Sequence, residues 1–257
     1  MRITVKVGTS TLAHPTGLLN IRHVEELCKV LSDLKNAGHE IILVSSGAIG
    51  MGVGKLSLGA RPDDMPTKQA AAAVGQCEIM YTYDKLFSEY NHTVAQILIT
   101  GEDMESADRH LNFRNTVLRL IELHVLPVIN ENDTVATAEI AVGDNDTLGA
   151  MVAASTDSDL LIVMSDIDGL YSSDPHCDKN AVLIPVVTEL TPEIYSLGGG
   201  RGSCLGTGGM ATKLHAASIC MEAGLDMLIV NGSDPSLLYK AAGGEPVGTR
   251  FIGRKKI

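Results

Sequence analysis

The chain alternates short apolar runs with longer stretches of helical periodicity. The apolar runs cover residues 3–7, 41–44, 93–99, 125–129, 160–164 and 227–230. Most of them end at Gly, Ser, Asn or Asp, a pattern typical of buried strands that run into loops. Helices are expected at 20–38, 70–90, 107–124, 147–155 and 209–223, with Asn20 as a cap and Gly38 as a stop. This alternation predicts an α/β fold: an open, mostly parallel sheet sandwiched by helices in three αβα layers.

The composition fits such a sheet. Of the 257 residues 45% are hydrophobic but only 4% are aromatic, so the core must be built from aliphatic side chains, Ala and Met. Parallel strands covered by helices suit these residues. The length allows one large domain or two lobes that share a sheet. We expect two lobes, residues 1–165 and 166–257, with a seam near Ser165.

Charge and cysteine usage exclude several classes of protein. The net charge of -11 argues against nucleic acid or an anionic membrane as the main partner. No apolar run approaches the roughly 20 residues of a membrane-spanning helix, and residues 1–10 lack the apolar core of a signal peptide. The five cysteines show no C-x-x-C spacing, which argues against a zinc site or a disulfide framework. We therefore expect a soluble cytoplasmic protein with reduced thiols.

Residues 129–146 carry the densest concentration of small polar side chains. Asn130-Glu131-Asn132-Asp133 follows a strand, and Asp144-Asn145-Asp146 precedes a helix. Carboxylates accept hydrogen bonds from an ammonium and amides donate to a carboxylate, so the two clusters could recognise a zwitterion. The alternative is a pair of Asx turns and a helix cap. Two clusters flanking one loop favour a binding site.

Two glycine-bearing segments could bind anions. Ser45-Ser46-Gly47-Ala48 lies at a strand-to-helix turn, where backbone N–H groups can hold an anion; a cap with a tight turn is the alternative. Residues 206–213, GTGGMATK, could cradle phosphates beside Lys213, although a surface loop next to a solvated lysine is also possible. Residues 49–56 are not a P-loop, because Ile49 replaces the first glycine and Leu56 replaces the Ser or Thr that binds magnesium.

Lys6 is unusual because it lies near the end of an otherwise apolar, central strand. A buried ammonium is costly unless an anion or a carboxylate meets it. Snorkelling from an edge strand is the alternative. The eight histidines are scattered, and none lies in a G-x-S-x-G or H-E-x-x-H context, so covalent catalysis is not favoured.

Together these motifs resemble the amino-acid kinase family, and most closely its members that act on glutamate. The pair NEND and VGDND is more specific than any single glycine loop. The resemblance runs in order along nearly the whole chain through these segments: KVGTS at 6–10, SSGAI at 45–49, KQAAAAVGQ at 68–76, INENDTVA at 129–136, VGDND at 142–146, GTGGMATK at 206–213 and VGTRF at 247–251.

The resemblance implies ATP-dependent phosphorylation of the γ-carboxylate of L-glutamate, the first committed step to proline. The implied reactants are L-glutamate and ATP, with Mg²⁺ carried by the nucleotide and no metal ligand assigned in the protein. It implies the following residue roles: Ser46, Gly47, Asp133 and Asn145 bind glutamate; Lys6 and Lys213 contact the phosphates; Asp146 orients both lysines; and Lys6, Ser165, Asp166, Thr207, Gly208, Gly209, Met210, Ala211, Thr212 and Lys213 bind ATP. A carboxylate acceptor is already ionised at neutral pH, so such a reaction needs no general base.

The resemblance also implies a homodimer or homotetramer, and it makes proline a candidate feedback inhibitor. Many family members continue into a C-terminal PUA domain, whereas this sequence ends soon after VGTRF, so we expect one kinase domain over 1–257 and no PUA domain. Ala141 stands where some relatives carry lysine. The rival interpretations are a sibling kinase for aspartate, acetylglutamate, carbamate or UMP, and a nucleotide- or amino-acid-binding regulator without turnover. The presence of both Lys6 and Lys213 argues against the regulator.

Overall fold

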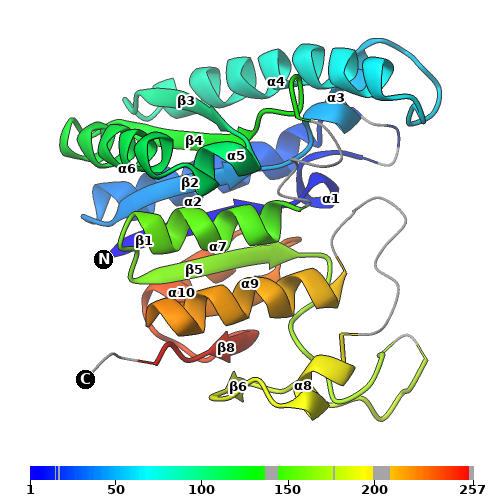
Figure 1. Ribbon diagram of the computed structural model, residues 1–257, viewed down its shortest axis with the longest axis vertical. Helices are drawn as coiled ribbons and strands as arrows, with labels where there is room; N and C mark the ends of the chain where they lie inside the picture. The colour runs from blue at the N-terminus through cyan, green and yellow to red at the C-terminus, as the bar shows by residue number, and fades with distance from the viewer. Residues whose placement is uncertain (15, 17, 137–143, 176, 199–208, 255–257) are drawn as a thin grey trace.

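The computed structural model describes residues 1–257 except 15, 17, 137–143, 176, 199–208 and 255–257 (Figure 1). Within this described part, one eight-stranded sheet has the order β3-β4-β2-β1-β5-β7-β8-β6. Neighbouring strands are parallel except for the β7–β8 pair. The strands are β1 (Arg2–Val7), β2 (Glu40–Ser45), β3 (Val94–Ile99), β4 (Leu126–Glu131), β5 (Leu160–Ser165), β6 (Val186–Val187), β7 (Asp226–Asn231) and β8 (Thr249–Phe251).

Strand β1 lies in the interior of the sheet, between β2 and β5. Its register places Lys6 beside Val44 of β2 and Val163 of β5. Residues 3–7 are all buried, as are all residues of β4 and β5. The near-continuous apolar runs are explained by this burial, because parallel strands are covered on both faces. The central position of β1 excludes the edge-strand explanation for Lys6.

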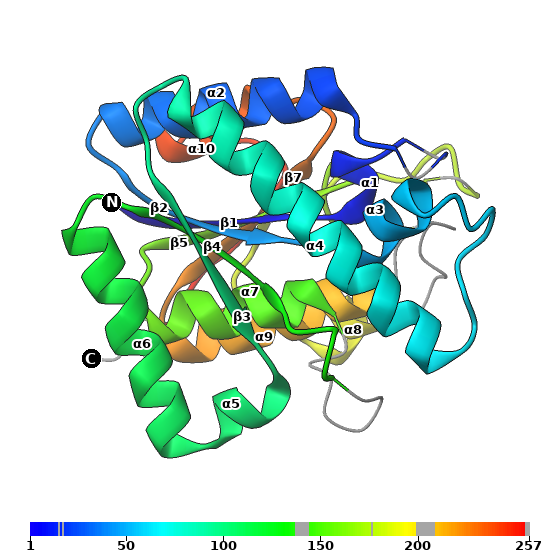
Figure 2. The same ribbon diagram turned by 90° about the horizontal axis from the view of Figure 1, so that it is seen from above.

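Helices cover both faces of the sheet and confirm the three-layer prediction (Figure 2). One face carries α2 (Ile21–Asn36), α4 (Met65–Ser88) and α10 (Leu237–Ala242), whose apolar side chains share one core with β1, β2 and β5. The other face carries α6 (Ala107–Glu122), α7 (Asn145–Ser155) and α9 (Met210–Ala223). No helix among the described residues is long and apolar enough to cross a membrane.

Side-chain caps set where three of the long helices begin. Asn20 caps α2, as predicted, by accepting from His23 N. Asp64 accepts from Thr67 N at 2.9 Å, so α4 begins at Met65 rather than at residue 70. Asp144 caps α7, which therefore begins at Asn145 and not at residue 147. In each helix the side chain satisfies a backbone N–H group that the first turn leaves without an intrahelical partner.

Several short elements were not predicted, because one or two turns show no measurable periodicity. A loop was expected at Gly8-Thr9-Ser10, yet Thr9–Leu12 form a helical turn directly after β1. The remaining elements are α1 (Thr9–Leu12), α3 (Ala48–Lys55), α5 (Gly101–Glu105) and α8 (Pro192–Ser196).

Candidate active site

A buried carboxylate between two lysines forms the centre of the candidate site. Lys6 Nζ lies 2.7 Å from Asp146 Oδ1, and Lys213 Nζ lies 3.1 Å from Asp146 Oδ2. The Asp146 side chain is 1% exposed, and the lysine side chains are 10% and 7% exposed. The three residues come from β1, α7 and α9, so the fold joins the two halves of the chain at this point.

Hydrogen bonding and charge keep the Asp146 carboxylate ionised. Thr212 Oγ1 donates to Asp146 Oδ2 at 3.0 Å. Burial alone would raise the pKa of Asp146, but the charges of Lys6 and Lys213 outweigh burial and lower this pKa to about 2. Two ammonium groups and one carboxylate leave one net positive charge on these three side chains at neutral pH. Phosphate oxygens complement such a charge, because buried cations are stabilised by a facing anion.

A cluster of amide and hydroxyl groups lies next to this charged centre. Asn145, the neighbour of Asp146, donates through Nδ2 to Ser46 Oγ at 2.7 Å and to Asn130 Oδ1 at 3.0 Å. A longer contact of 3.3 Å joins the same Nδ2 to Ser45 O. Ser46 follows β2, Asn130 lies near the end of β4, and Asn145 begins α7. The structure therefore brings the predicted pair Ser46 and Asn145 together.

Gly47 lets the chain turn from β2 into α3 beside this cluster. It is the N-cap of α3 with φ of 100°, a left-handed conformation that favours glycine. No side chain caps α3. Its first N–H groups face the same end of the sheet as Ser46, which fits an anion such as a carboxylate.

Asp133 lies in the turn that follows β4, three residues after Asn130. Burial raises the pKa of its carboxyl, while the positive charge of Arg61 acts in the opposite direction. No ion pair with Asp133 is present among the described residues. A desolvated carboxylate at the strand end suits an ammonium ligand, as the sequence suggested.

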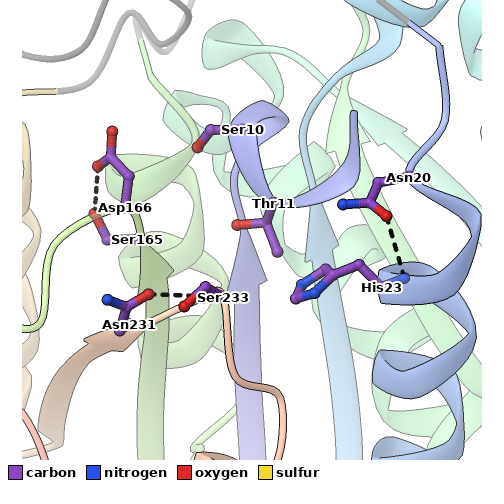
Figure 3. A pocket seen from close by; sticks show the side chains of 9 residues that line it. Ser10, Thr11, Asn20, His23, Ser165, Asp166, Asn231 and Ser233 are labelled. Carbon is purple, nitrogen blue, oxygen red and sulfur yellow. Dashed lines mark hydrogen bonds between the residues drawn. The ribbon is translucent and has the colours of Figure 1, made fainter. Parts of the chain in front are cut away.

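A polar pocket with a volume of about 390 Å³ lies at the ends of β5 and β7 (Figure 3). Ser165 and Asp166, both predicted to bind nucleotide, line it. Ser165 Oγ donates to Asp166 Oδ1 at 3.2 Å. No ligand-binding role was predicted for the other lining residues, which are Ser10, Thr11, Asn20, His23, Asn231, Gly232 and Ser233.

The remaining residues predicted to bind ATP lie around the start of α9, and the structure describes those from Gly209 onward. Gly209 is the N-cap of α9, and Met210, Ala211, Thr212 and Lys213 form its first turn. Lys213 is therefore a buried member of the charged centre and not a solvated surface lysine. Thr207, Gly208 and Ala141 lie outside the described residues.

The sequence matches the model of the amino acid kinase family over residues 1–231. The chain belongs to the amino acid kinase family. Two relatives of this chain are named glutamate 5-kinase. The protein from Clostridium acetobutylicum is 52% identical, over 99% of this chain and 96% of its own length. The protein from Clostridium tetani is 54% identical, over 97% of this chain and 93% of its own length.

Another glutamate 5-kinase, from Caldanaerobacter subterraneus, is 49% identical over 99% of this chain but only 68% of its own length. Solved structures of other kinases share the fold at low identity. Carbamate kinase from Giardia lamblia bound to AMP-PNP gives a TM-score of 0.70 at 15% identity and covers 98% of both chains. UMP kinase from Ureaplasma parvum gives 0.68 at 14%, again over 98% of both. These two similarities confirm the predicted fold class.

Two buried residues of the amide cluster, Asn130 and Gln76, stood in predicted motifs but were given no role of their own. Asn130 Nδ2 donates to Gln76 Oε1 at 2.9 Å, and the two side chains belong to residues that are 2% and 7% exposed. Asn130 stood in the NEND motif and Gln76 at the end of KQAAAAVGQ, so both motifs were noted. Their contact spans 54 residues of sequence, and only the packing of α4 against the sheet reveals it.

Proposed function

We propose that this protein transfers the γ-phosphate of ATP to the γ-carboxylate of L-glutamate, giving L-glutamyl 5-phosphate and ADP, the first step of proline biosynthesis. The observation that carries the proposal is the adjacency of Asn145 and Asp146. Asn145 belongs to the amide cluster and Asp146 to the charged centre. A phosphate acceptor held at the cluster and a phosphate held at the centre would therefore meet at the start of α7. Relatives named glutamate 5-kinase at about half identity over nearly the whole chain support the choice of acceptor.

In this mechanism Ser46, Gly47, Asp133 and Asn145 hold glutamate. Asp133 pairs with the substrate ammonium, and its desolvated carboxylate is suited to that charge. The γ-carboxylate is ionised at neutral pH and attacks the γ-phosphorus directly. The bond from that phosphorus to the β,γ-bridging oxygen breaks, and ADP leaves with the electron pair. No general base takes part.

Lys6 and Lys213 neutralise the negative charge that builds up on the transferred phosphoryl group and on the leaving oxygen. Asp146 fixes both ammonium groups by an ion pair to each of its oxygens. Each Asp146 oxygen is paired with a lysine, and we assign no magnesium ligand among these three residues. Mg²⁺ commonly binds through substrate phosphates and water, and we propose that it arrives with ATP and supplies charge neutralisation there.

We propose that the nucleotide lies over residues 166–257 and the amino acid over residues 1–165. Ser165 and Asp166 line a polar pocket, and Gly209 to Lys213 begin α9. The N–H groups of that first turn suit phosphate oxygens. Thr207 and Gly208 complete the proposed nucleotide set.

We further propose a cytoplasmic enzyme that forms a homodimer or homotetramer, with proline as a feedback inhibitor. The cysteines in the described chain form no disulfide, which fits a reducing compartment. Closed symmetric oligomers are common among such enzymes. A monomer by light scattering at micromolar concentration would contradict the assembly proposal, and unchanged kinetics in excess proline would contradict the inhibition.

The test is glutamate-dependent release of ADP, with hydroxylamine present to trap the acyl phosphate as a hydroxamate. Aspartate, N-acetylglutamate, carbamate and UMP serve as competing acceptors in the same assay. We expect ADP and hydroxamate to form together with glutamate alone. Turnover with another acceptor would assign the protein to a sibling kinase, and nucleotide binding without turnover would make it a regulator.

A further inference from the structure

Helix α4 contacts the proposed amino-acid site through two glutamines that the mechanism above does not use. Gln69 and Gln76 both stand in the KQAAAAVGQ segment and are two helical turns apart, so they lie on one face of α4. Gln69 Nε2 donates to Ala136 O at 3.3 Å. Gln76 Oε1 accepts from Asn130 Nδ2 at 2.9 Å. Both glutamines thus contact the 130–136 segment, which contains Asp133.

Gln76 is one end of a chain of hydrogen bonds, buried at Gln76 and Asn130 and half-buried beyond them, that leads to Ser46. Asn130 donates to Gln76 through Nδ2, and Asn130 Oδ1 accepts from Asn145 Nδ2 at 3.0 Å. Asn145 Nδ2 donates in turn to Ser46 Oγ at 2.7 Å. These residues come from α4, β4, the start of α7 and the turn after β2. The hydrogen bonds therefore connect four segments that are far apart in the sequence.

The partners of Asn130 determine which way the Asn145 amide points. Glu131 N donates to Asn130 Oδ1 at 2.9 Å, and Gln76 Oε1 accepts from the opposite end of the same amide. A flipped Asn130 would place its NH₂ group against the Glu131 N–H and its oxygen against Gln76 Oε1. The unflipped Asn130 presents an acceptor to Asn145, which therefore directs Nδ2 towards Ser46 and turns Oδ1 away from these acceptors.

The backbone of α4 is held closely enough to act as a rigid support. A Cβ atom on Gly75 would lie 1.8 Å from Ala48 O, and one on Gly52 would lie 1.8 Å from Ala71 O. Helices α3 and α4 therefore pack backbone to backbone directly beside Gln76. A second buried contact from α4, between Tyr83 Oη and Ser45 Oγ at 3.0 Å, reaches the residue before Ser46.

From these contacts we propose that Gln76 is a positioning residue for the amino-acid substrate. Through Asn130 it holds the Asn145 amide in the orientation in which Oδ1 accepts from the substrate ammonium, while Nδ2 fixes Ser46. Gln76 itself does not touch glutamate. This role rests on the function proposed above. It adds a residue that does not contact the substrate but holds a substrate-binding side chain in place.

The test compares a substitution that removes the acceptor with one that keeps it. Gln76→Met keeps the length of the side chain and removes Oε1, whereas Gln76→Glu keeps an oxygen that accepts from Asn130. Leaving a buried donor unsatisfied typically costs enough to change an equilibrium by about tenfold. We expect Gln76→Met to raise the KM for glutamate about tenfold, with the KM for ATP and kcat changed less than about twofold. Gln76→Glu should have a KM for glutamate much closer to that of the wild type.

Cys77→Ala, at the exposed neighbouring position, is the matched control and should leave all three constants unchanged. Equal KM values for Gln76→Met and Gln76→Glu, or a loss confined to kcat, would overturn the proposal. Both variants are also melted with and without saturating glutamate. A smaller glutamate-induced rise in Tm for Gln76→Met reports weaker binding even if turnover is too slow to measure, and an unchanged rise would overturn the proposal.

A double substitution tests whether Gln76 acts through Asn130. If it does, Gln76→Met combined with Asn130→Leu binds glutamate no more weakly than Asn130→Leu alone. Additive losses would mean that Gln76 acts by another route and would overturn the relay. The wild-type assay separates this inference from the function itself. Without glutamate-dependent ADP release the proposed function fails, whereas release with an unaffected Gln76→Met variant removes only the positioning role.

Discussion

Asn145 and Asp146 are consecutive in the chain, yet their side chains enter two different clusters. Asn145 Nδ2 lies 2.7 Å from Ser46 Oγ, while the Asp146 carboxylate lies between Lys6 and Lys213. The separation arises because both stand in the first turn of α7, where successive side chains diverge by about 100°. Asp144 fixes that turn by accepting from Asp146 N at 2.8 Å. One helix start thus joins the amide cluster to the charged centre.

Replacing Lys213 should lower kcat far more than it weakens glutamate binding. In Lys213→Ala the transferred phosphoryl group loses one preorganised cation, and such a loss typically lowers kcat by about 10²–10³-fold. The KM for glutamate should change little, because Lys213 contacts Asp146 and not the amide cluster. Steady-state kinetics with both substrates measure this. Lys55→Ala, which removes an exposed lysine paired with Glu78, is the control. A normal kcat with an altered KM for glutamate would show that the assigned role is wrong.

Removing the carboxylate of Asp146 should destabilise the fold even without substrates. Asp146→Asn leaves Lys6 and Lys213 buried without their anion, and breaking a buried pair in this way costs about 3–5 kcal/mol. Urea unfolding at pH 7 measures the loss, with Asp84→Asn at an exposed position of α4 as the control. A loss below 1 kcal/mol would mean that water reaches the lysines in the folded protein.

The same ion pairs predict how the free energy of unfolding changes with pH. The Asp146 pKa is about 2 in the folded protein and close to 3.9 in an unfolded chain. Its contribution is therefore complete above about pH 4 and is lost as the pH falls towards 2. The difference in unfolding free energy between wild type and Asp146→Asn should stay constant from pH 7 to 5 and shrink below pH 4. A difference that shrank near neutral pH would contradict the lowered pKa.

Close packing of α3 on α4 should make Gly75 intolerant of any side chain. In Gly75→Ala the new methyl group would meet Ala48 O at 1.8 Å, so the two helices must separate. Overpacking typically costs about 1–3 kcal/mol, and a clash with backbone lies at the upper end because no side chain can move aside. The KM for glutamate should rise as well, since Gln76 moves with α4. Ala73→Ser at an exposed position of α4 is the control, and a stable Gly75→Ala variant with a normal KM would refute the rigid support.

Much of the fold was predictable because it depends on local periodicity. The strand runs, the long helices and the Asn20 cap follow from residues within a few positions of one another. The central place of Lys6 also followed, since its neighbours are apolar on both sides. The short elements α1, α5, α8 and α10 did not follow, because one or two turns carry no periodic signal.

The candidate site was predictable only where a motif marked it. NEND and VGDND pointed to Asn145, and Asp146 was assigned from the resemblance. The Gln76–Asn130 contact depends on how α4 packs against the end of β4, which no local pattern in the sequence specifies. The residues of the polar pocket, such as Thr11 and His23, come from a helical turn and a helix start that the chain folds towards β7. No spacing in the sequence encodes that proximity.

Asp133 provides a test of recognition that is separate from chemistry. If its carboxylate pairs with the substrate ammonium, Asp133→Asn keeps the shape and removes the charge. Truncating a desolvated ion pair costs about 2–5 kcal/mol, so the KM for glutamate should rise steeply while the KM for ATP stays near the wild-type value. Glutarate lacks the ammonium and should lose much less. Measuring kcat/KM for both acids on both proteins closes a thermodynamic cycle, and equal losses would mean that Asp133 only supports the turn after β4.

The raised pKa of Asp133 predicts how glutamate affinity responds to acid. Burial raises this pKa above the ordinary value, so the carboxyl takes up its proton at a higher pH than an exposed aspartate does. The protonated form cannot pair with an ammonium, and the KM for glutamate should therefore begin to increase, as the pH falls, at a higher pH than an exposed aspartate would give. The substrate carboxyls have ordinary pKa values near 4, so their protonation contributes at lower pH. Asp133→Asn is the control, because any pH dependence that it retains belongs to glutamate or to the other site residues. If the KM of the wild type and that of the variant changed in parallel as the pH falls, the ammonium of glutamate would have to be recognised by a carboxylate other than Asp133.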